Sequence, residues 1–377
     1  MILPIIRQRE ELGMNKRFLI AAGGTGGHFY PGFSLGRLLN KQGCSVLFVV
    51  RKGDVASRVL SENKLKFTEI DFCALPRTVN PWKHIVFFYK LCKSFRQINR
   101  IIEQFKPDVA VGTGGYVSFP LIFMAHRKGI KTAVHDSNTK IGLANRACSY
   151  FTDLFMLGLP TDKKFKKSVL VGTPIRKEFG DAFDRSKVLK DLGLNPDCLT
   201  ILLFGGSQGA RGLNQALIEA VKRLVAENEG VQFIHISGER WYQTINNSYG
   251  KINRVNVLPY SNEIYDLIHV SDLLVCRSGA GTIAELIYCH KPAILVPFPA
   301  AAANHQFYNA KVLQSVGCAT IALESAHLEA DLYTQMERML NAPNNSILQT
   351  MQENYAKLNL PDPLTASERI AHQLKEL

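Results

Sequence analysis

The chain has 377 residues, of which 46% are hydrophobic and 20% charged, a composition typical of a globular protein long enough for two domains. No apolar run reaches the roughly 18 residues that a membrane-spanning helix needs, and the 8 cysteines occur singly, which gives no indication of disulfides or a zinc site. The formal net charge of +13 favours an anionic partner, such as a phosphorylated substrate, an anionic lipid surface or nucleic acid.

Short apolar runs alternate with helix-like segments along the whole chain. In the first half the predicted strands are 18–22, 45–50, 67–70, 109–111, 132–135 and 154–156. In the second half they are 200–204, 232–236, 255–258, 273–276, 293–296 and 319–322. Apolar strands that alternate with helices predict parallel sheets covered on both faces.

The two halves resemble each other. The first opens with a strand that runs into Gly23-Gly-Thr-Gly-Gly, and the second with a strand that runs into Gly205-Gly-Ser-Gln-Gly. Each half also has a later strand that ends in a glycine turn. This pattern indicates an internal duplication of a doubly wound α/β domain, with a polar, turn-rich linker within 151–190. Two such domains facing each other would place both sets of glycine loops around one cleft.

The first glycine loop, Gly23-Gly-Thr-Gly-Gly-His28, lies between a predicted strand and a predicted helix, where backbone N–H groups can bind an anion. His28 can move a proton near neutral pH. The spacing lacks the third glycine of the dinucleotide fingerprint, and the second strand runs into Arg51 rather than an acid, which argues against a dinucleotide oxidoreductase. A structural turn is the alternative interpretation.

Three loops of the second half suit a nucleotide sugar. Ser207 adds a hydroxyl donor to the loop at 205–211, which predicts a phosphate site, although a tight turn is an alternative. Glu285 lies near the start of a helix, where it can accept hydrogen bonds from a ribose diol or simply stabilise the helix. Gln306 and Asn309 share one helix face and suit neutral sugar hydroxyls, or a solvated surface.

Two further segments carry polar or basic character. His135-Asp-Ser-Asn138 follows a strand of the first half, whereas no G-x-S-x-G, H-E-x-x-H or D-x-D motif occurs, so we expect neither a serine nucleophile nor a metal clamped by aspartates. The basic stretch 75–100 interleaves aromatic and aliphatic residues with cations, which is typical of a membrane-surface helix. Nucleic-acid binding or a core helix with a basic outer face are the alternatives.

Taken in order from about residue 20 to 310, these motifs resemble the MurG family of bacterial N-acetylglucosaminyltransferases. The matching segments are 23–28 with Pro31, 112–120, Asn138 with Gly142 and 145–146, 172–176, 205–210, 277–280 with Glu285, and His305-Gln306 with Asn309. The resemblance implies the GT-B fold: two Rossmann-like α/β domains at 14–170 and 171–358, and a C-terminal helix within 359–377 that packs back on the first domain.

The resemblance also implies a reaction. N-acetylglucosamine would pass from UDP-N-acetylglucosamine, with inversion and no cofactor or metal, to the muramoyl 4-hydroxyl of undecaprenyl-linked lipid I, giving lipid II in peptidoglycan synthesis. The enzyme would be peripheral on the cytoplasmic face of the inner membrane, bound to its anionic surface, with no nucleic acid as partner. His28 would be the general base. The substrate-binding residues would be Thr25, Gly26, Gly27, Asn138, Arg176, Ser207, Ser261, Ala280, Glu285, Gln306 and Asn309.

Individual positions depart from the family pattern. Asp136, Ser137 and Thr173 stand where the family has Glu, Gln and Asn, and Ala300 and Gly281 also differ from it. These changes leave the nucleotide-binding motifs intact, so the departures point to a related acceptor or altered kinetics. Three alternative functions are considered. They are a transferase for another lipid acceptor, a UDP-sugar epimerase of similar fold, and a non-catalytic UDP-sugar-binding protein.

Overall fold

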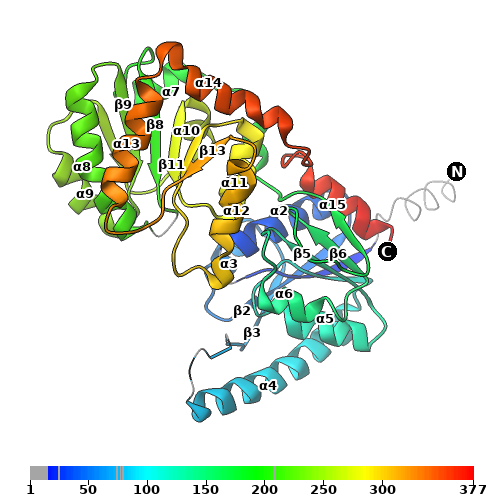
Figure 1. Ribbon diagram of the computed structural model, residues 1–377. Helices are drawn as coiled ribbons and strands as arrows, with labels where there is room; N and C mark the ends of the chain where they lie inside the picture. The colour runs from blue at the N-terminus through cyan, green and yellow to red at the C-terminus, as the bar shows by residue number, and fades with distance from the viewer. Residues whose placement is uncertain (1–15, 24–25, 74, 77, 79, 207–208) are drawn as a thin grey trace, which may run out of the picture. The chain divides into compact units, whose positions relative to one another are not determined.

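The computed structural model describes residues 16–23, 26–73, 75–76, 78, 80–206 and 209–377. Two residues expected in the site, Thr25 and Ser207, lie outside the described residues. The chain forms two compact units (Figure 1). The first holds the described residues up to Arg176 together with Pro361–Leu377, and the second holds Lys177–Leu360.

The first unit is built on a seven-stranded sheet in the order β3-β2-β1-β4-β5-β6-β7, with every neighbouring pair parallel. Strand β1 lies in the interior of this sheet, between β2 and β4, and its residues Phe18–Ala21 are fully buried. The strands are β1 (Arg17–Ala21), β2 (Ser45–Arg51), β3 (Phe67–Ile70), β4 (Val109–Gly112), β5 (Lys131–Asp136), β6 (Leu154–Leu157) and β7 (Ser168–Leu170).

Helices cover both faces of this sheet. One face packs against α2 (Gly26–Lys41), α3 (Val55–Glu62) and the C-terminal helix α15 (Ala366–Lys375). The other packs against α4 (Pro81–Phe105) and α5 (Ser118–Arg127), and α6 (Leu143–Cys148) joins α5 in a smaller cluster. Burial on both faces explains why the strands are continuous apolar runs without alternation.

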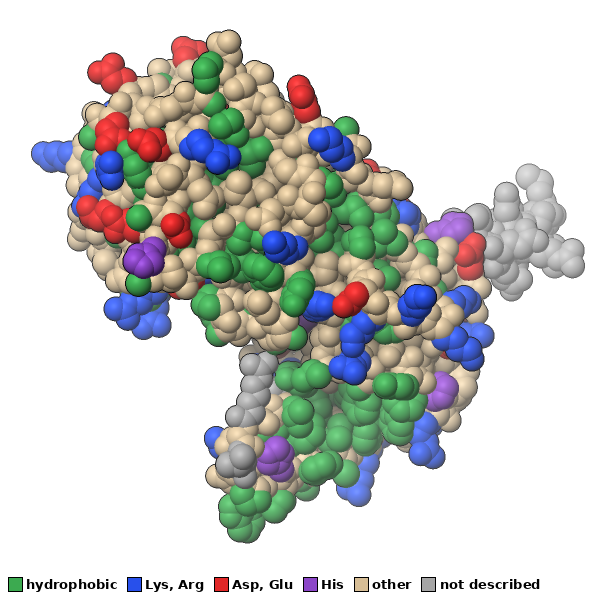
Figure 2. All heavy atoms as spheres, in the orientation of Figure 1, with side chains coloured by type: hydrophobic (Ala, Val, Ile, Leu, Met, Phe, Trp, Pro, Cys, Tyr) green, Lys and Arg blue, Asp and Glu red, His purple; other side chains and the backbone are tan. Residues whose placement is uncertain are grey.

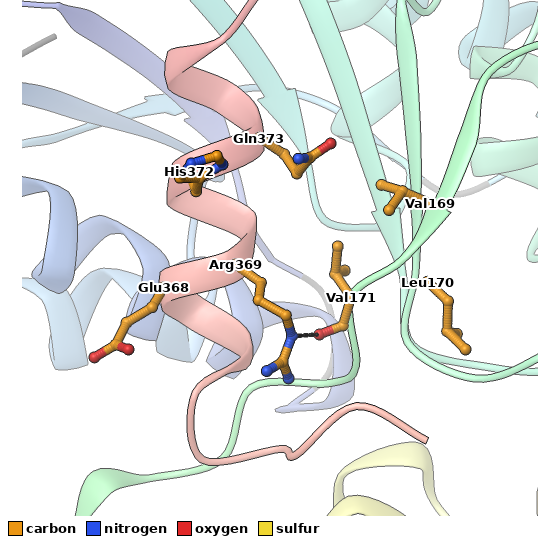
Figure 3. A pocket seen from close by; sticks show the side chains of 7 residues that line it. All are labelled: Val169, Leu170, Val171, Glu368, Arg369, His372 and Gln373. Carbon is orange, nitrogen blue, oxygen red and sulfur yellow. Dashed lines mark hydrogen bonds between the residues drawn. The ribbon is translucent and has the colours of Figure 1, made fainter. Parts of the chain in front are cut away.

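The C-terminal segment of the chain, Pro361–Leu377, packs on the first unit. Ile370, Ala371 and Leu374 of α15 belong to the same core as α2, and Lys16 Nζ donates to the carbonyl of Lys375 at 2.7 Å. Arg369 Nε donates to the carbonyl of Val171 at 2.9 Å, beside a pocket of about 330 Å³ between β7 and α15 (Figure 3). Residues 171–176 therefore belong to the first unit, whereas the sequence assigned them to the second domain.

The second unit has a six-stranded, all-parallel sheet in the order β10-β9-β8-β11-β12-β13. Its strands are β8 (Leu199–Phe204), β9 (Val231–Ile236), β10 (Val255–Leu258), β11 (Leu273–Cys276), β12 (Ala293–Leu295) and β13 (Ala319–Ile321). Helices α8 (Arg211–Glu227), α9 (Tyr242–Tyr249), α13 (Leu328–Leu340) and α14 (Ser346–Glu353) share one large core with the sheet. The remaining helices are α7 (Arg185–Asp191), α10 (Ile264–Val270), α11 (Ala280–Cys289) and α12 (His305–Gln314).

Each strand predicted from the sequence is present, with ends shifted by at most a residue or so. The sequence missed β7, because its three residues adjoin the lysine-rich stretch 163–167 that was interpreted as linker. β7 is an edge strand whose side chains are all at least partly exposed, so it lacks the apolar signature of the others. None of the helices in the described part of the chain combines the length and apolarity that crossing a membrane requires.

Candidate functional site

The chain order of the strands reverses at one point in each sheet. In the first unit this switch lies between β1 and β4, and in the second it lies between β8 and β11. Ligands of doubly wound sheets bind beyond the carboxyl ends of the strands at such points. All four of these strands run into the glycine turns that the sequence singled out. The topology therefore brings two glycine turns together within each unit.

In the first unit the two turns are held against each other. Helix α2 begins at Gly26, directly after the first turn, and Gly26 and Gly27 are exposed. Thr113, in the second turn, donates its hydroxyl to the carbonyls of His28 at 2.8 Å and Ala21 at 3.2 Å. These bonds fix the first turn of α2 on the end of β4.

The imidazole of His28 lies on the backbone of Gly114. A Cβ at Gly114 would stand 3.0 Å from Cγ and 3.1 Å from Nε2 of His28, and closer still to Cδ2. Gly114 also has φ +105°, a conformation that other residues rarely adopt. The second glycine turn is thus the platform under the histidine, which the sequence did not indicate.

Asn138 lies in a loop organised by the carboxylate of Asp136. One oxygen of Asp136 accepts from the backbone N of Asn138 at 3.0 Å and from its Nδ2 at 3.2 Å. The other accepts from the backbone N of Gly142 at 3.1 Å and from Nδ2 of Asn145 at 3.0 Å. Asp136 is buried and holds the loop rather than projecting from it. His135 is also buried, which lowers its pKa, and it bonds the carbonyl of Gly172 at 3.0 Å.

In the second unit the turn between β8 and α8 is shaped by glycine. Gly206 and Gly209 have φ of +98° and +70°, and the N–H of Gly209 donates to the carbonyl of Gly206 at 2.9 Å. The N-cap residue of α8, Ala210, has no side chain that can cap the helix. The first N–H groups of α8 are therefore not satisfied by an N-cap side chain, as expected of a site for a phosphate group.

Two arginines pack on the tryptophan beside this turn. The guanidinium groups of Arg211 and Arg240 lie 5.7 Å and 5.2 Å from the ring of Trp241, which packs beside Gly209. Their positive charge adds to that of the helix N-terminus. The electrostatics at the turn thus favour an anion.

A partly buried ion pair connects three loops of the second unit. Arg277, at the end of β11, donates to the carbonyls of Val296 at 3.1 Å and Pro297 at 3.3 Å and pairs with Glu324 at 2.5 Å. The carboxylate of Glu324 in turn lies against Gly212 in the first turn of α8. Arg277 appeared in the sequence only as part of a motif, and Glu324 had no signal, because the pairing is visible only in three dimensions.

Gln306 and Asn309 of α12 form hydrogen bonds with the backbone of the loops that follow β12 and β11. Gln306 Oε1 accepts from the backbone N of Phe298 at 2.9 Å, and Asn309 Nδ2 donates to the carbonyl of Ser278 at 3.3 Å. Ser278 Oγ returns a bond to the carbonyl of Gln306 at 2.8 Å. Asn309 is completely buried, so its amide positions the turn after β11, whereas Gln306 is only half-buried.

The other expected residues lie at the same edge of the second sheet, except Arg176. Ala280 is the first residue of α11, and Glu285 lies farther along this helix, half-buried. Burial, and after it the charge of Glu285, raises the pKa of the Cys276 thiol, which places this carboxylate near the end of β11. Ser261 follows β10, and its hydroxyl accepts from the N–H of Glu263 at 3.1 Å. Arg176 is the last residue of the first unit before the chain enters the second unit at Lys177. Among the described residues, no group of three or more His, Cys, Asp or Glu side chains is placed to hold a metal ion.

Comparisons with known proteins agree with this architecture. The N-terminal and C-terminal domain models of glycosyltransferase family 28 match residues 18–156 and 200–365. The crystal structure of MurG from Acinetobacter baumannii is similar in fold, with a TM-score of 0.78 at 24% identity over 96% of this chain and 100% of that one.

Relatives identified by sequence narrow the family further, because they share one named activity. The chain is 51% identical over 362 residues to the UDP-N-acetylglucosamine–N-acetylmuramyl-(pentapeptide) pyrophosphoryl-undecaprenol N-acetylglucosamine transferase of Elusimicrobium minutum, covering 96% of this chain and 100% of the relative. It is 34% identical to the protein of the same name from Desulfitobacterium hafniense strain Y51, covering 92% of this chain and 96% of that protein. The chain therefore belongs to glycosyltransferase family 28 and, within it, to the MurG family of N-acetylglucosamine transferases.

Proposed function

We propose that this protein transfers N-acetylglucosamine from UDP-N-acetylglucosamine to lipid I, the undecaprenyl-pyrophosphoryl N-acetylmuramyl-pentapeptide, and so forms lipid II. The observation that carries the proposal is 51% identity over nearly the whole length of a relative with this named activity. The glycine turns at both switch points support it, because each suits a phosphate-bearing substrate.

The second unit would hold the donor. Its turn at 205–210 and the N-terminus of α8 would bind the diphosphate, with Ser207, which lies outside the described residues, as a hydroxyl donor. Glu285 would hold the ribose, and the backbone near Ser261 and Ala280 would face the rest of the nucleotide. Gln306 would contact the sugar. The complete burial of Asn309 favours a positioning role for it over the direct sugar contact expected from the sequence.

The first unit would supply the acceptor side and the base. The 4-hydroxyl oxygen of the muramoyl sugar attacks the anomeric carbon of N-acetylglucosamine. At the same time the bond between this carbon and the UDP oxygen breaks, and UDP leaves with the bonding electrons. His28 takes the hydroxyl proton, and the configuration inverts. Arg176 and the helix N–H groups would stabilise the charge that develops on UDP. Gly26, Gly27 and Asn138, together with Thr25 outside the described residues, would line the acceptor side.

A transfer assay tests this proposal. Purified protein is incubated with radiolabelled UDP-N-acetylglucosamine and a lipid I analogue, and labelled lipid is counted for the wild type and His28→Ala. Loss of a general base costs roughly 10²–10⁴ in turnover. A near-normal rate in His28→Ala would refute the assignment of the base. UDP binding without turnover on lipid I would favour a non-catalytic protein, and transfer to diacylglycerol instead would favour another acceptor.

We also propose that α4 attaches the protein to an anionic membrane surface from the cytoplasmic side. Its first turns expose large apolar side chains, including Trp82 at 73%, Phe88 at 61% and Tyr89 at 67%. Only Ser94, Ile98 and Ile102 of this helix are buried, so the core-helix interpretation applies only to its C-terminal half. Figure 2 shows apolar side chains gathered over α4, α5 and α6.

Cations accompany this apolar surface. Lys83, Arg96 and Arg100 are exposed along α4. Lys90 and Lys93 each pair with Asp71 at 3.0 Å, and these two bonds lower the pKa of Asp71. An exposed apolar tip followed by basic side chains is the arrangement of helices that lie in a membrane interface.

Vesicle sedimentation tests the attachment. Burying one large apolar side chain is worth about 1.5–3 kcal/mol, so Trp82→Ser combined with Phe88→Ser should weaken binding to phosphatidylglycerol vesicles by more than about tenfold. Val55→Ser is the control, because Val55 is 76% exposed on α3 of the same unit. Equal sedimentation of the double variant and the wild type would refute the role of α4.

A further inference from the structure

The turn that would bind the donor diphosphate rests on a carbonyl group of the neighbouring strand. Gly209 approaches the end of β9 so closely that a Cβ there would collide with the carbonyl oxygen of Ser237 and would lie 3.0 Å from Cδ1 of Trp241. The position of Gly209, near the end of the turn, therefore depends on where this carbonyl lies.

Asn214, in the first turn of α8, forms a hydrogen bond with the carbonyl of Ser237. Asn214 Nδ2 donates to it at 2.8 Å, while the backbone N of Asn214 donates to the carbonyl of Ala210 at 2.8 Å. Asn214 thus ties the end of the turn to the end of β9. Asn214 and Ser237 are both buried, so water does not replace these bonds.

Two more buried side chains fix the orientation of the Asn214 amide. Because its Nδ2 donates to Ser237, its Oδ1 must accept, and Nε2 of His235 lies 3.3 Å away. His235 Nδ1 is 2.9 Å from the hydroxyl of Tyr249, the last residue of α9. Burial lowers the pKa of His235 to about 3, so the ring is neutral and carries one N–H. Only the Nε2–H tautomer satisfies both neighbours.

The four groups form a chain of hydrogen bonds that runs in one direction, from the Tyr249 hydroxyl through His235 and Asn214 to the Ser237 carbonyl. We propose that Tyr249, His235 and Asn214 are positioning residues that hold Gly209 and Ala210, the end of the diphosphate-binding turn, in place. The inference rests on the proposed donor role of this turn. None of the three would touch the substrate.

The test uses isosteric variants of the full-length protein. Tyr249→Phe removes only the hydroxyl that starts the chain, and we expect the KM for UDP-N-acetylglucosamine to rise roughly three- to tenfold, the net value of one buried hydrogen bond. The KM for the lipid I analogue and kcat should stay within about twofold. A purely structural role would instead lower the folded fraction and reduce kcat without raising the donor KM.

The chain offers a matched control and a rescue. Tyr333→Phe removes a hydroxyl that bonds Glu227 and Glu337, at the opposite end of α8, and should leave the donor KM unchanged. His235→Gln keeps one donor and one acceptor and should lie closer to the wild type than His235→Leu, which keeps neither. An unchanged donor KM in both Tyr249→Phe and His235→Leu would overturn the proposal.

A measurement of UDP binding tests the positioning role independently of the proposed transfer to lipid I. The chain has 2 tryptophans, so in a Trp82→Phe background the fluorescence of Trp241 reports on the turn, and UDP alone is titrated. Weaker UDP binding in Tyr249→Phe supports the positioning role even if lipid I is not a substrate. Equal dissociation constants for Tyr249→Phe and its parent would refute it even if transfer to lipid I is observed.

Discussion

The glycine platform under His28 gives the sharpest prediction. In Gly114→Ala the new methyl group would stand 3.0 Å from Cγ and 3.1 Å from Nε2 of the imidazole, and nearer to Cδ2. Ordinary contacts between such atoms are about 3.5–4.0 Å, so the ring has to move by about 1 Å. A misplacement of about 1 Å in a catalytic group can cost on the order of 10²-fold in rate.

The same substitution also strains the backbone. Gly114 has φ +105°, and a left-handed conformation costs an alanine roughly 1–2 kcal/mol. The expected phenotype is therefore a modest loss of stability with a large loss of kcat. The affinity for UDP should not change, because the turn that would bind it belongs to the second unit.

The measurements are transfer to the lipid I analogue, UDP titration and urea unfolding. Gly129→Ala is the control, because Gly129 has φ +71° and nothing within 4 Å of the new Cβ, so it adds strain without a collision. Its kcat should stay near that of the wild type after a comparable loss of stability. If Gly114→Ala keeps a kcat within about threefold of Gly129→Ala, the position of His28 does not limit the reaction.

Two more predictions concern the second unit. Glu324→Gln weakens the ion pair with Arg277 and should lower the free energy of unfolding by about 1–3 kcal/mol, between the values for exposed and for fully buried pairs, and raise the donor KM. Glu62→Gln breaks an exposed pair with Arg58 and should cost under about 0.5 kcal/mol, so equal losses in urea unfolding would contradict the reasoning. Burial lowers the pKa of His235 from 6.5 in the unfolded chain to about 3 in the folded protein. Below pH 6.5 the unfolded chain therefore binds a proton that the folded protein does not. The free energy of unfolding should fall by about 1.4 kcal/mol for each pH unit below 6.5. His235→Gln should remove that slope in urea titrations between pH 4.5 and 6.5, and an unchanged slope would show that the site does not contribute.

Much of the fold follows from local sequence. Buried parallel strands are apolar on both sides, so their runs are visible without knowledge of their partners. Strand β1, with Phe18–Ala21 fully buried, is an example. β7 shows the limit, because an edge strand of three partly exposed residues carries no such signal. The boundary between the units at Arg176 could not be predicted from local sequence either. Residues 171–176 join the first unit through hydrogen bonds such as that from Arg369 to the carbonyl of Val171, which lies 198 positions away in the sequence.

The candidate site was predictable as a set of turns but not as a set of contacts. Glycine-rich turns after strands indicate where ligands bind, because the backbone conformation is encoded locally. The contact of Gly114 with His28 and the pair of Arg277 with Glu324 join segments far apart in the chain. For the same reason Asn309 suited a sugar contact in the sequence, and only the structure shows that its amide is buried against Ser278.

Three of the five positions that depart from the family pattern, Asp136, Ser137 and Thr173, lie in one region of the first unit. A Cβ on Gly158 would meet both the hydroxyl of Thr173 and the Cα of Ser137, so these two residues are neighbours. Both are buried in the first unit, and neither hydroxyl finds a hydrogen-bond partner within the described part of the chain. Asp136, although shorter than the family's glutamate, still makes four hydrogen bonds that hold the Asn138 loop. These three departures therefore lie at the base of the Asn138 loop, which would face the acceptor, and not in the turn at 205–210 that would bind the diphosphate.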